Sequence, residues 1–470
     1  MSNPYDEVAY PTDLCRRSHP ERLAVLAHMA GLEPVDPARA RILEIGGGDC
    51  LNLLALAATY PGCDAHGFDL SHAAIAKGQR FVDTGGIANA TLVHEDICKA
   101  KERYAAKSFD YVIAQGVYAW VPPHVREAMM DLVGHVLSDR GIAFIGYNCM
   151  PGGHLRLVLH EMLRDEIAGI EAPNEQIAVA RDFLSSYSEP RDDDDAFAQA
   201  LRHQAKDMLK RPAAVVFHDE MSAAFHPQRL LDVVHAAQAC GMRYLGDSGR
   251  RLMFQGFVEA EQPDSDITDD AIVRTASRDD YEKRRFFRQS MFVRREQPID
   301  RKLDNRRLDG LYVSSRLRHG EDSVFMFGKE KLTVSDAEFH ADLSRIIAHS
   351  PQRLPLSEFA TSQRKIDALL HLLDQYFLDF YTSPAPFAAN PGPRPQASPL
   401  VRAMVAHDES LIHTLSHDDV DIESPGLRRL LLLLDGSRDV SEIEKADHGV
   451  ASGEIRKALD NAAKLALLVE

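Results

Sequence analysis

Apolar residues in the first 150 positions form short continuous runs that are separated by longer segments with helical spacing. Runs at 41–45, 109–114 and 141–148, and two more that end at Asp69 and Asp96, are typical of buried strands. The segment 124–137 has helical spacing and begins after two prolines. Strands that alternate with helices predict an α/β fold with a doubly wound, Rossmann-like parallel sheet, whose ligands bind at the carboxyl ends of the strands.

A glycine turn directly follows the first strand. The run 41–45 ends in Gly46-Gly47-Gly48-Asp49, and a helical pattern begins at Leu51. Glycines at such a turn let the backbone approach a ligand closely, because a side chain would collide with it. Asp69 lies about 20 residues further on and can accept hydrogen bonds from both hydroxyls of a ribose. Two ligands fit this pattern, a dinucleotide and S-adenosylmethionine.

The details of the turn favour S-adenosylmethionine. A dinucleotide site would place a third glycine where this chain has Leu51. Residues 44–50 instead resemble the methyltransferase pattern of an acid followed by glycines, with Cys50 where a third glycine is usual. Glu44 suits the cationic sulfonium and amino group of S-adenosylmethionine, and Asp96 would accept from the adenine amino group. The predicted cofactor-binding residues are Tyr10, Glu44, Gly46, Gly47, Gly48, Asn52, Asp69, Leu70, Asp96, Ile97, Gln115 and Gly116.

The sheet is not complete at residue 150. Residues 155–211 are helical and charged, 213–217 have strand-like composition, 228–240 have helical spacing, and 242–246 and 287–293 again resemble strands. We therefore predict a methyltransferase domain over 1–296, with a core at 1–154 and 212–296 and the helices of 155–211 inserted as a lid. The last two strands would form the antiparallel hairpin with which such sheets usually finish.

Several segments then resemble one bacterial family. They are 5–11, 19–23, 116–122, 147–148 with 151–152, 217–219 and 284–289. Together they resemble class I S-adenosylmethionine-dependent methyltransferases with a methyltransferase regulatory domain, a family similar to the rickettsial protein-lysine methyltransferases. The resemblance implies a protein or peptide substrate, with lysine as one candidate acceptor. A methyltransferase of small molecules or natural products, and a non-catalytic scaffold that only binds the cofactor, remain as alternatives.

Candidate catalytic residues lie after the fourth and fifth strands and in the regulatory segment. They are Tyr118, Trp120, Tyr147, His154 and His218. An aromatic ring can favour the cation that develops on a methylated amine, and His218 could orient a base or simply cap a strand end. Enzymes that methylate amide nitrogens or nucleobases place Asn or Asp with Pro-Pro-Tyr after the fourth strand. Here Gln115-Gly116-Val117-Tyr118 stands instead, which does not support those reactions.

The remaining chain has no catalytic pattern. We expect a small α+β module at 300–383, with two strands about Gly328 and a capping box at 335–338 that opens a helix. A proline-rich segment at 384–399 is typical of a linker. Helices at 427–434, 440–446 and 453–465 predict a winged-helix-like module over 400–470, which would serve docking or homodimer formation. DNA binding by this module is the alternative.

Composition narrows the choice of partners. The formal net charge of −17 argues against nucleic acid as a partner. The basic and aromatic stretch 283–288 is expected to enter an edge strand, with its phenylalanines facing the core. Six scattered cysteines and the lack of a His-Glu-x-x-His motif predict free thiols and no metal. Without a signal peptide or a long apolar run, the sequence predicts a cytoplasmic protein without a membrane span.

Overall fold

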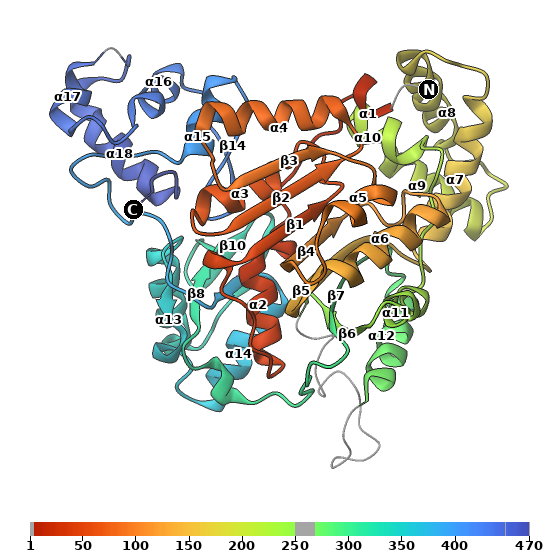
Figure 1. Cartoon of the computed structure of the whole chain (residues 1–470), viewed down its shortest axis with the longest axis horizontal. Helices are drawn as coiled ribbons and strands as arrows, with labels where there is room; N and C mark the ends of the chain where they lie inside the picture. The colour runs from red at the N-terminus through yellow and green to blue at the C-terminus, as the bar shows by residue number, and fades with distance from the viewer. Residues whose placement is uncertain (1–3, 250–267, 447, 470) are drawn as a thin grey trace.

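The computed structural model describes residues 4–249, 268–446 and 448–469. At its centre lies a seven-stranded sheet with the order β3-β2-β1-β4-β5-β7-β6 (Figure 1). Its strands are β1 (Arg41–Ile45), β2 (Asp64–Asp69), β3 (Ala90–His94), β4 (Phe109–Gln115), β5 (Leu137–Asn148), β6 (Met242–Asp247) and β7 (Phe287–Arg294). β1 to β5 run parallel, and β7 runs antiparallel to both β5 and β6. The predicted Rossmann-like sheet and its closing antiparallel hairpin are confirmed.

Helices cover both faces of this sheet. One face packs against α2 (Pro20–Met29), α3 (Leu51–Thr59) and α4 (His72–Gly85), and the other against α5 (Ile97–Arg103), α6 (Pro123–Val136), α11 (Leu230–Ala239) and α12 (Asp269–Lys283). Alternate residues of a strand point to opposite faces. Accordingly Tyr111 and Ile113 of β4 lie in the first core, whereas Val112 and Ala114 lie in the second. The apolar runs of the sequence are continuous because both faces are buried.

The insertion after β5 forms a small helical unit with its own core. It consists of α7 (Gly153–Glu166), α8 (Pro173–Tyr187) and α9 (Ala196–Leu209). The expected strand at 213–217 is wrong, because the chain there forms α10 (Ala213–Val215) and a π-helical turn over Val216–Glu220. Val216 and Phe217 are buried against these helices, the predicted lid, instead of the sheet. A short apolar run is compatible with a strand or a helical turn, and here the contacts with α7–α9 favour the helical turn.

The chain beyond residue 300 forms two small sheets, a hairpin and several helices. These are β8 (Tyr312–Ser315), β9 (Arg318–His319), β10 (Val324–Phe327), β11 (Glu330–Thr333), α13 (Ala337–His349), β12 (Leu354–Pro355), α14 (Gln363–Asp374), β13 (Leu378–Tyr381), α15 (Pro399–Ala406), β14 (Leu411–His413), β15 (Asp419–Asp421), α16 (Pro425–Leu433), α17 (Val440–Lys445) and α18 (Ile455–Lys464). The strand pair about Gly328 and the three late helices are confirmed. The helix expected near 335 begins one residue later than a cap at Ser335 would give, because Asp336 accepts from the Phe339 N–H.

The proline-rich segment is packed, which overturns its interpretation as a linker. Phe387 and Ala397 are buried, and the Ala397 N–H donates to the Leu434 carbonyl over 2.9 Å. The first core extends without a break from the α2–α4 face of the sheet into the region beyond residue 300. In Figure 1, the lid helices and α16–α18 lie at opposite ends of the molecule, with α4 along the side between them.

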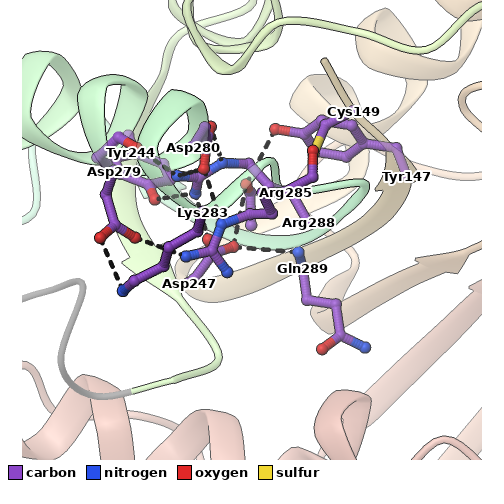
Figure 2. Close-up of polar contacts among 12 residues, drawn as sticks. Tyr147, Cys149, Tyr244, Asp247, Asp279, Asp280, Lys283, Arg285, Arg288 and Gln289 are labelled. Atoms are coloured by element: carbon purple, nitrogen blue, oxygen red, sulfur yellow. Dashed lines mark hydrogen bonds and ion pairs between the residues drawn. The ribbon is translucent and has the colours of Figure 1, made fainter. Parts of the chain in front are cut away.

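The expectation for the basic stretch 283–288 is also corrected. β6 is the edge of the sheet and β7 lies inside it, while the Phe286 side chain is 63% exposed. Figure 2 shows how the cations of this stretch are used: Arg288 is fully buried between Asp247 and Asp280, and Arg285 pairs with Asp279 and Asp280. Within the described ranges, no helix is both long and apolar enough to cross a bilayer.

Candidate functional site

The glycine turn after β1 has the backbone geometry that its sequence predicts. Gly46 and Gly48 have φ of +64° and +61°, values that favour glycine, and the Gly46 N–H donates to the Phe68 carbonyl over 2.9 Å. A Cβ on Gly46 would stand 2.6 Å from a methyl group of Val117. Cys50, at the position of the usual third glycine, is itself left-handed with φ +56°. The chain thus keeps the conformation of that glycine with a small buried side chain.

Asp69, the last residue of β2, closes the turn. One carboxylate oxygen accepts from the Gly48 N–H over 2.9 Å, and the other accepts from the Ser71 N–H over 2.8 Å. Burial raises the pKa of this carboxyl. Each oxygen keeps a second lone pair, which is the acceptor capacity that a ribose diol requires.

Glu44 and Asn52 form a buried pair behind the turn. Glu44 Oε1 accepts from the Asn52 amide over 2.7 Å, and Glu44 Oε2 has no hydrogen-bond partner among the described residues. Oε2 lies 2.8 Å from where a Cβ on Gly47 would be. Burial raises the pKa of Glu44 to about 7. Asn52 Oδ1 accepts from the Cys15 N–H and from His417, so its amide is held by protein groups on both sides.

The remaining predicted cofactor residues lie at the ends of neighbouring strands. Asp96 caps α5 by accepting from the Cys98 N–H over 2.9 Å, with Ile97 next to it, and Leu70 is 58% exposed after Asp69. Gln115 pairs in register with Gly146, and its side chain fills the space that a Cβ there would need. Gly116 has φ +71° and open space where its Cβ would point.

These features fit S-adenosylmethionine. In the described part of the chain, Glu44 Oε2 and Gln115 Oε1 are buried oxygens without hydrogen-bond partners, and acceptors of that kind need a donor. Both oxygens are covered by protein, and the positive charge of a methionine amino group bound at the turn suits the nearby Glu44 carboxylate. Which of these residues touch the cofactor stays a prediction.

The N-terminal segment crosses the strand ends beside this turn. Asp6 of α1 (Pro4–Glu7) accepts from the Ser71 hydroxyl over 2.7 Å and from the Ala73 N–H over 3.0 Å, and these bonds lower its pKa. Further along, the Tyr10 hydroxyl donates to Asp219 over 3.2 Å. The segment therefore runs from the start of α4 to the π-helical turn, and α1 lies between α4 and α10 in Figure 1.

Two aromatic rings of this segment meet other aromatic rings and a carboxylate from the regions after β4 and around the π-helical turn. We call this group the aromatic–acidic cluster: Tyr5, Tyr10, Trp120, His218, Asp219 and Phe225. His218 stacks on Tyr5 with centroids 4.2 Å apart, and its Nε2–H donates to the Val8 carbonyl. Asp6, the neighbour of Tyr5, accepts from the Ser71 hydroxyl, and Asp69 accepts from the Ser71 N–H. The cluster therefore lies close to the turn acid Asp69.

Arg156 of α7 joins the two halves of the cluster. Its guanidinium lies 4.9 Å above the ring of Trp120, which stacks on Phe225 at 4.4 Å. The same guanidinium donates to Asp219 over 3.0 Å and to Glu220 over 2.9 Å. The lid is thus attached to the π-helical turn by charge-assisted bonds.

The catalytic candidates divide into two groups. Trp120 and His218 belong to the cluster, whereas Tyr118 and Tyr147 are buried in the core on the α6 side of the sheet. The Tyr147 hydroxyl lies 3.1 Å from that of Ser290, and His154 is exposed at the start of α7. Sequence reasoning missed Asp6, Arg156 and Phe225. Their roles depend on contacts between distant segments, so no local pattern marks them.

Comparison with known proteins identifies the family. Residues 42–141 match a family described as a methyltransferase domain, and residues 212–294 match a predicted methyltransferase regulatory domain. The uncharacterized protein RP028 of Rickettsia prowazekii is 30% identical over 216 residues, which cover 46% of this chain and 86% of RP028. The chain belongs to this family of methyltransferases. Its domain match and fold make it an S-adenosylmethionine-dependent methyltransferase.

Solved structures share the fold of this methyltransferase over almost its whole length. PKMT2 from Rickettsia typhi matches with a TM-score of 0.79 and 21% identity, over 98% of this chain and 100% of PKMT2. The complex of PKMT2 with AdoHcy matches with a TM-score of 0.77 and 22% identity over the same shares. A second uncharacterized relative from Rickettsia prowazekii, RP789, is 26% identical over 64% of this chain and 55% of its own length.

Proposed function

We propose that this methyltransferase acts on an amino group of a protein or peptide, with the side chain of lysine as the preferred acceptor. The observation that carries the proposal is the aromatic–acidic cluster beside the cofactor turn. A lysine arrives as a cation, and a carboxylate surrounded by aromatic rings attracts a cation. Asp219 supplies a carboxylate, which it shares with Arg156, and the half-exposed Tyr5 and Tyr10 supply rings, whereas one face of Trp120 is covered by Arg156.

Methyl transfer requires mainly that the protein hold the two reactants in the correct orientation. S-adenosylmethionine supplies a methyl group on a sulfonium, which is already a good leaving group. The chain holds the acceptor nitrogen in line with that methyl group, and such positioning is the main source of rate in a displacement of this kind. A lysine ammonium must first lose a proton, because the cation has no lone pair. Partial burial among aromatic rings lowers the pKa of an amine and favours the reactive form.

The likeness to PKMT2 from Rickettsia typhi supports the cofactor part of this proposal. PKMT2 has the same fold, and one of its structures is a complex with AdoHcy. At 21% identity the match shows a shared fold, and the methyl acceptor has to be tested on this chain itself.

The acceptor can be found with labelled cofactor. The full chain is incubated with a bacterial extract and S-adenosylmethionine that carries an isotopically labelled methyl group, and the extract is then separated by size. The proposal predicts label on lysine in the protein fraction by mass spectrometry. Label confined to small molecules would favour the small-molecule alternative, and the absence of both label and S-adenosylhomocysteine would favour a scaffold.

A charge-neutral variant tests the role of the cluster. We expect Asp219→Asn to raise the KM for the acceptor roughly tenfold, because a charge-assisted contact is lost, with unchanged affinity for S-adenosylhomocysteine. Asp194→Asn is the matched control, since Asp194 pairs with Arg202 within the lid and away from the cluster. Equal effects of the two variants would contradict the proposed acceptor position.

A further inference from the structure

The tip of the β14–β15 hairpin reaches into the N-terminal part of the molecule. Arg16 donates to the carbonyls of Ser416 and His417 over 3.0 and 3.2 Å, and it pairs with Asp418 over 2.7 Å. On the other side, the Leu415 carbonyl lies 3.4 Å from the Thr59 hydroxyl of α3, which donates to the Ala55 carbonyl over 2.8 Å. The loop between the two strands is therefore fixed against α3, the helix that follows the glycine turn.

His417 is the residue of this loop that reaches the cofactor turn. It is 3% exposed, and its φ of +59° lies in the left-handed region, which is uncommon for a residue other than glycine. Its Nε2 lies 2.9 Å from Asn52 Oδ1. Its Nδ1 has no hydrogen-bond partner among the described residues, so the bond to Asn52 is the one that orients the ring. A buried residue held in a strained conformation for a single such bond points to a function for the contact.

The direction of this hydrogen bond follows from the other bonds of Asn52. Asn52 Oδ1 also accepts from the Cys15 N–H over 3.0 Å, and Asn52 Nδ2 donates to Glu44 over 2.7 Å. The atom facing His417 is therefore an oxygen, and His417 must donate to it. Burial, with the nearby His19 and Arg16, lowers the pKa of His417 well below its usual value, so the ring is a neutral donor.

Rotation of the Asn52 amide would break its bonds with the Cys15 N–H and with ionised Glu44, and it would reverse the direction of its bond with His417. It would place an oxygen against the Glu44 carboxylate and an NH₂ group against the Cys15 N–H. His417 and Cys15 together hold the amide in one orientation, Asn52 holds Glu44, and Glu44 lies directly under Gly47. Each bond lost from this chain of contacts would leave a further buried polar atom unpaired, which is costly, so the observed arrangement is favoured.

We propose that His417 is a positioning residue of the cofactor site, acting through Asn52 on Glu44 and the glycine turn. The C-terminal region is thereby part of the cofactor site. This inference rests on the cofactor assignment and is independent of the acceptor proposed above.

The test is calorimetric titration of the full chain with S-adenosylhomocysteine. His417→Phe keeps the ring volume and removes the donor, and we expect roughly three- to tenfold weaker binding, the range for one lost hydrogen bond. His417→Gln keeps an N–H donor and should recover most of the affinity. His413→Ala is the matched control, because His413 is buried in the same hairpin and bonds Asp419. This control should bind like the wild type.

Two results would overturn the proposal. One is equal affinity of the His417→Phe and His417→Gln variants, which would make the hydrogen bond irrelevant to the cofactor. The other is equal weakening by His417→Phe and His413→Ala, which would mean that the hairpin contributes only general stability. If the wild type does not bind S-adenosylhomocysteine, the cofactor assignment itself fails, whereas a failed search for a protein acceptor leaves this test intact.

Discussion

At Glu44, burial and ligand charge act in opposite directions. Without ligand, burial raises the pKa of this carboxyl to about 7, because the charged form loses its hydration. A cationic amino group bound at the turn would favour the charged form of Glu44 and lower its pKa again. Binding of the cofactor should therefore release a proton from Glu44 at slightly acidic pH.

This proton release can be measured by calorimetry. Titration with S-adenosylhomocysteine at pH 6.5 in two buffers of different ionisation enthalpy should give different apparent binding enthalpies. Because the pKa of Glu44 is higher in the folded than in the unfolded chain, protonation of Glu44 favours folding. This contribution to the free energy of unfolding is fully present below about pH 4.5 and is lost as pH rises through about 7. Without ligand, Glu44→Gln should therefore gain stability relative to the wild type over that interval.

The Gln variant is also the control for the calorimetry. Its amide oxygen can still accept from Asn52, and it cannot titrate, so the two buffers should give more similar enthalpies than they do for the wild type. An equal buffer dependence in both proteins would assign the released proton to another group.

At the same scale, the sequence predicted the backbone of the turn, whereas it did not predict that Tyr118 and Tyr147 are buried in the core, and their catalytic roles stay a prediction. Gly46, Gly48 and Asp69 lie within a short stretch whose function depends on local backbone geometry. Tyr147 shares its strand face with the buried Ala143 and Ile145, so the alternation of side chains places it in the core. Proximity to a strand end alone does not bring a side chain to the ligand.

At the scale of elements, the lid is attached through one buried ionic group. Glu220 is fully buried and accepts from both Arg156 and Arg211, over 2.9 and 2.6 Å. Its neighbour Asp219 faces the proposed acceptor site. The expected strand at 213–217 failed because its apolar residues pack under this lid, and such a choice depends on partners distant in the sequence.

Removal of one partner should loosen the lid. We expect Arg156→Met to lower stability by about 3 kcal/mol, because it leaves a buried carboxylate with a single arginine. Amide exchange in α7–α9 should become faster and the thermal midpoint should fall. The double variant Arg156→Met/Glu220→Met removes the unpaired charge and should recover part of the loss.

A surface pair provides the comparison. Arg229 and Asp232 form an exposed pair three residues apart, and Arg229→Met should lower stability much less than Arg156→Met does. If Arg156→Met costs no more than this control, the buried pair does not hold the lid.

At the scale of the whole molecule, contacts cross both of the domain boundaries that the sequence predicts near residues 300 and 400. Glu21 of α2 accepts from Thr382, Ser383 and Arg353, and Lys77 of α4 pairs with Glu409. Residues rich in proline, alanine and serine are compatible with a linker and with a packed loop alike. Contacts such as His417 to Asn52 join positions 365 residues apart, and a single sequence gives no signal for them.

The shared core predicts that the two parts unfold together. Trp120 is the single tryptophan of the chain and lies beside the lid, so its fluorescence reports on the methyltransferase part. Amide exchange of α15–α18 reports on the C-terminal part. In rising urea both signals should change over the same interval, because loss of either part exposes the apolar face of the other. Arg353→Met, which leaves the buried Glu21 without that arginine, should shift both transitions to lower urea. A shift confined to the C-terminal signal, with Trp120 unchanged, would show that the C-terminal region folds as a separate module and that its contacts with the cofactor turn contribute little to the stability of the sheet.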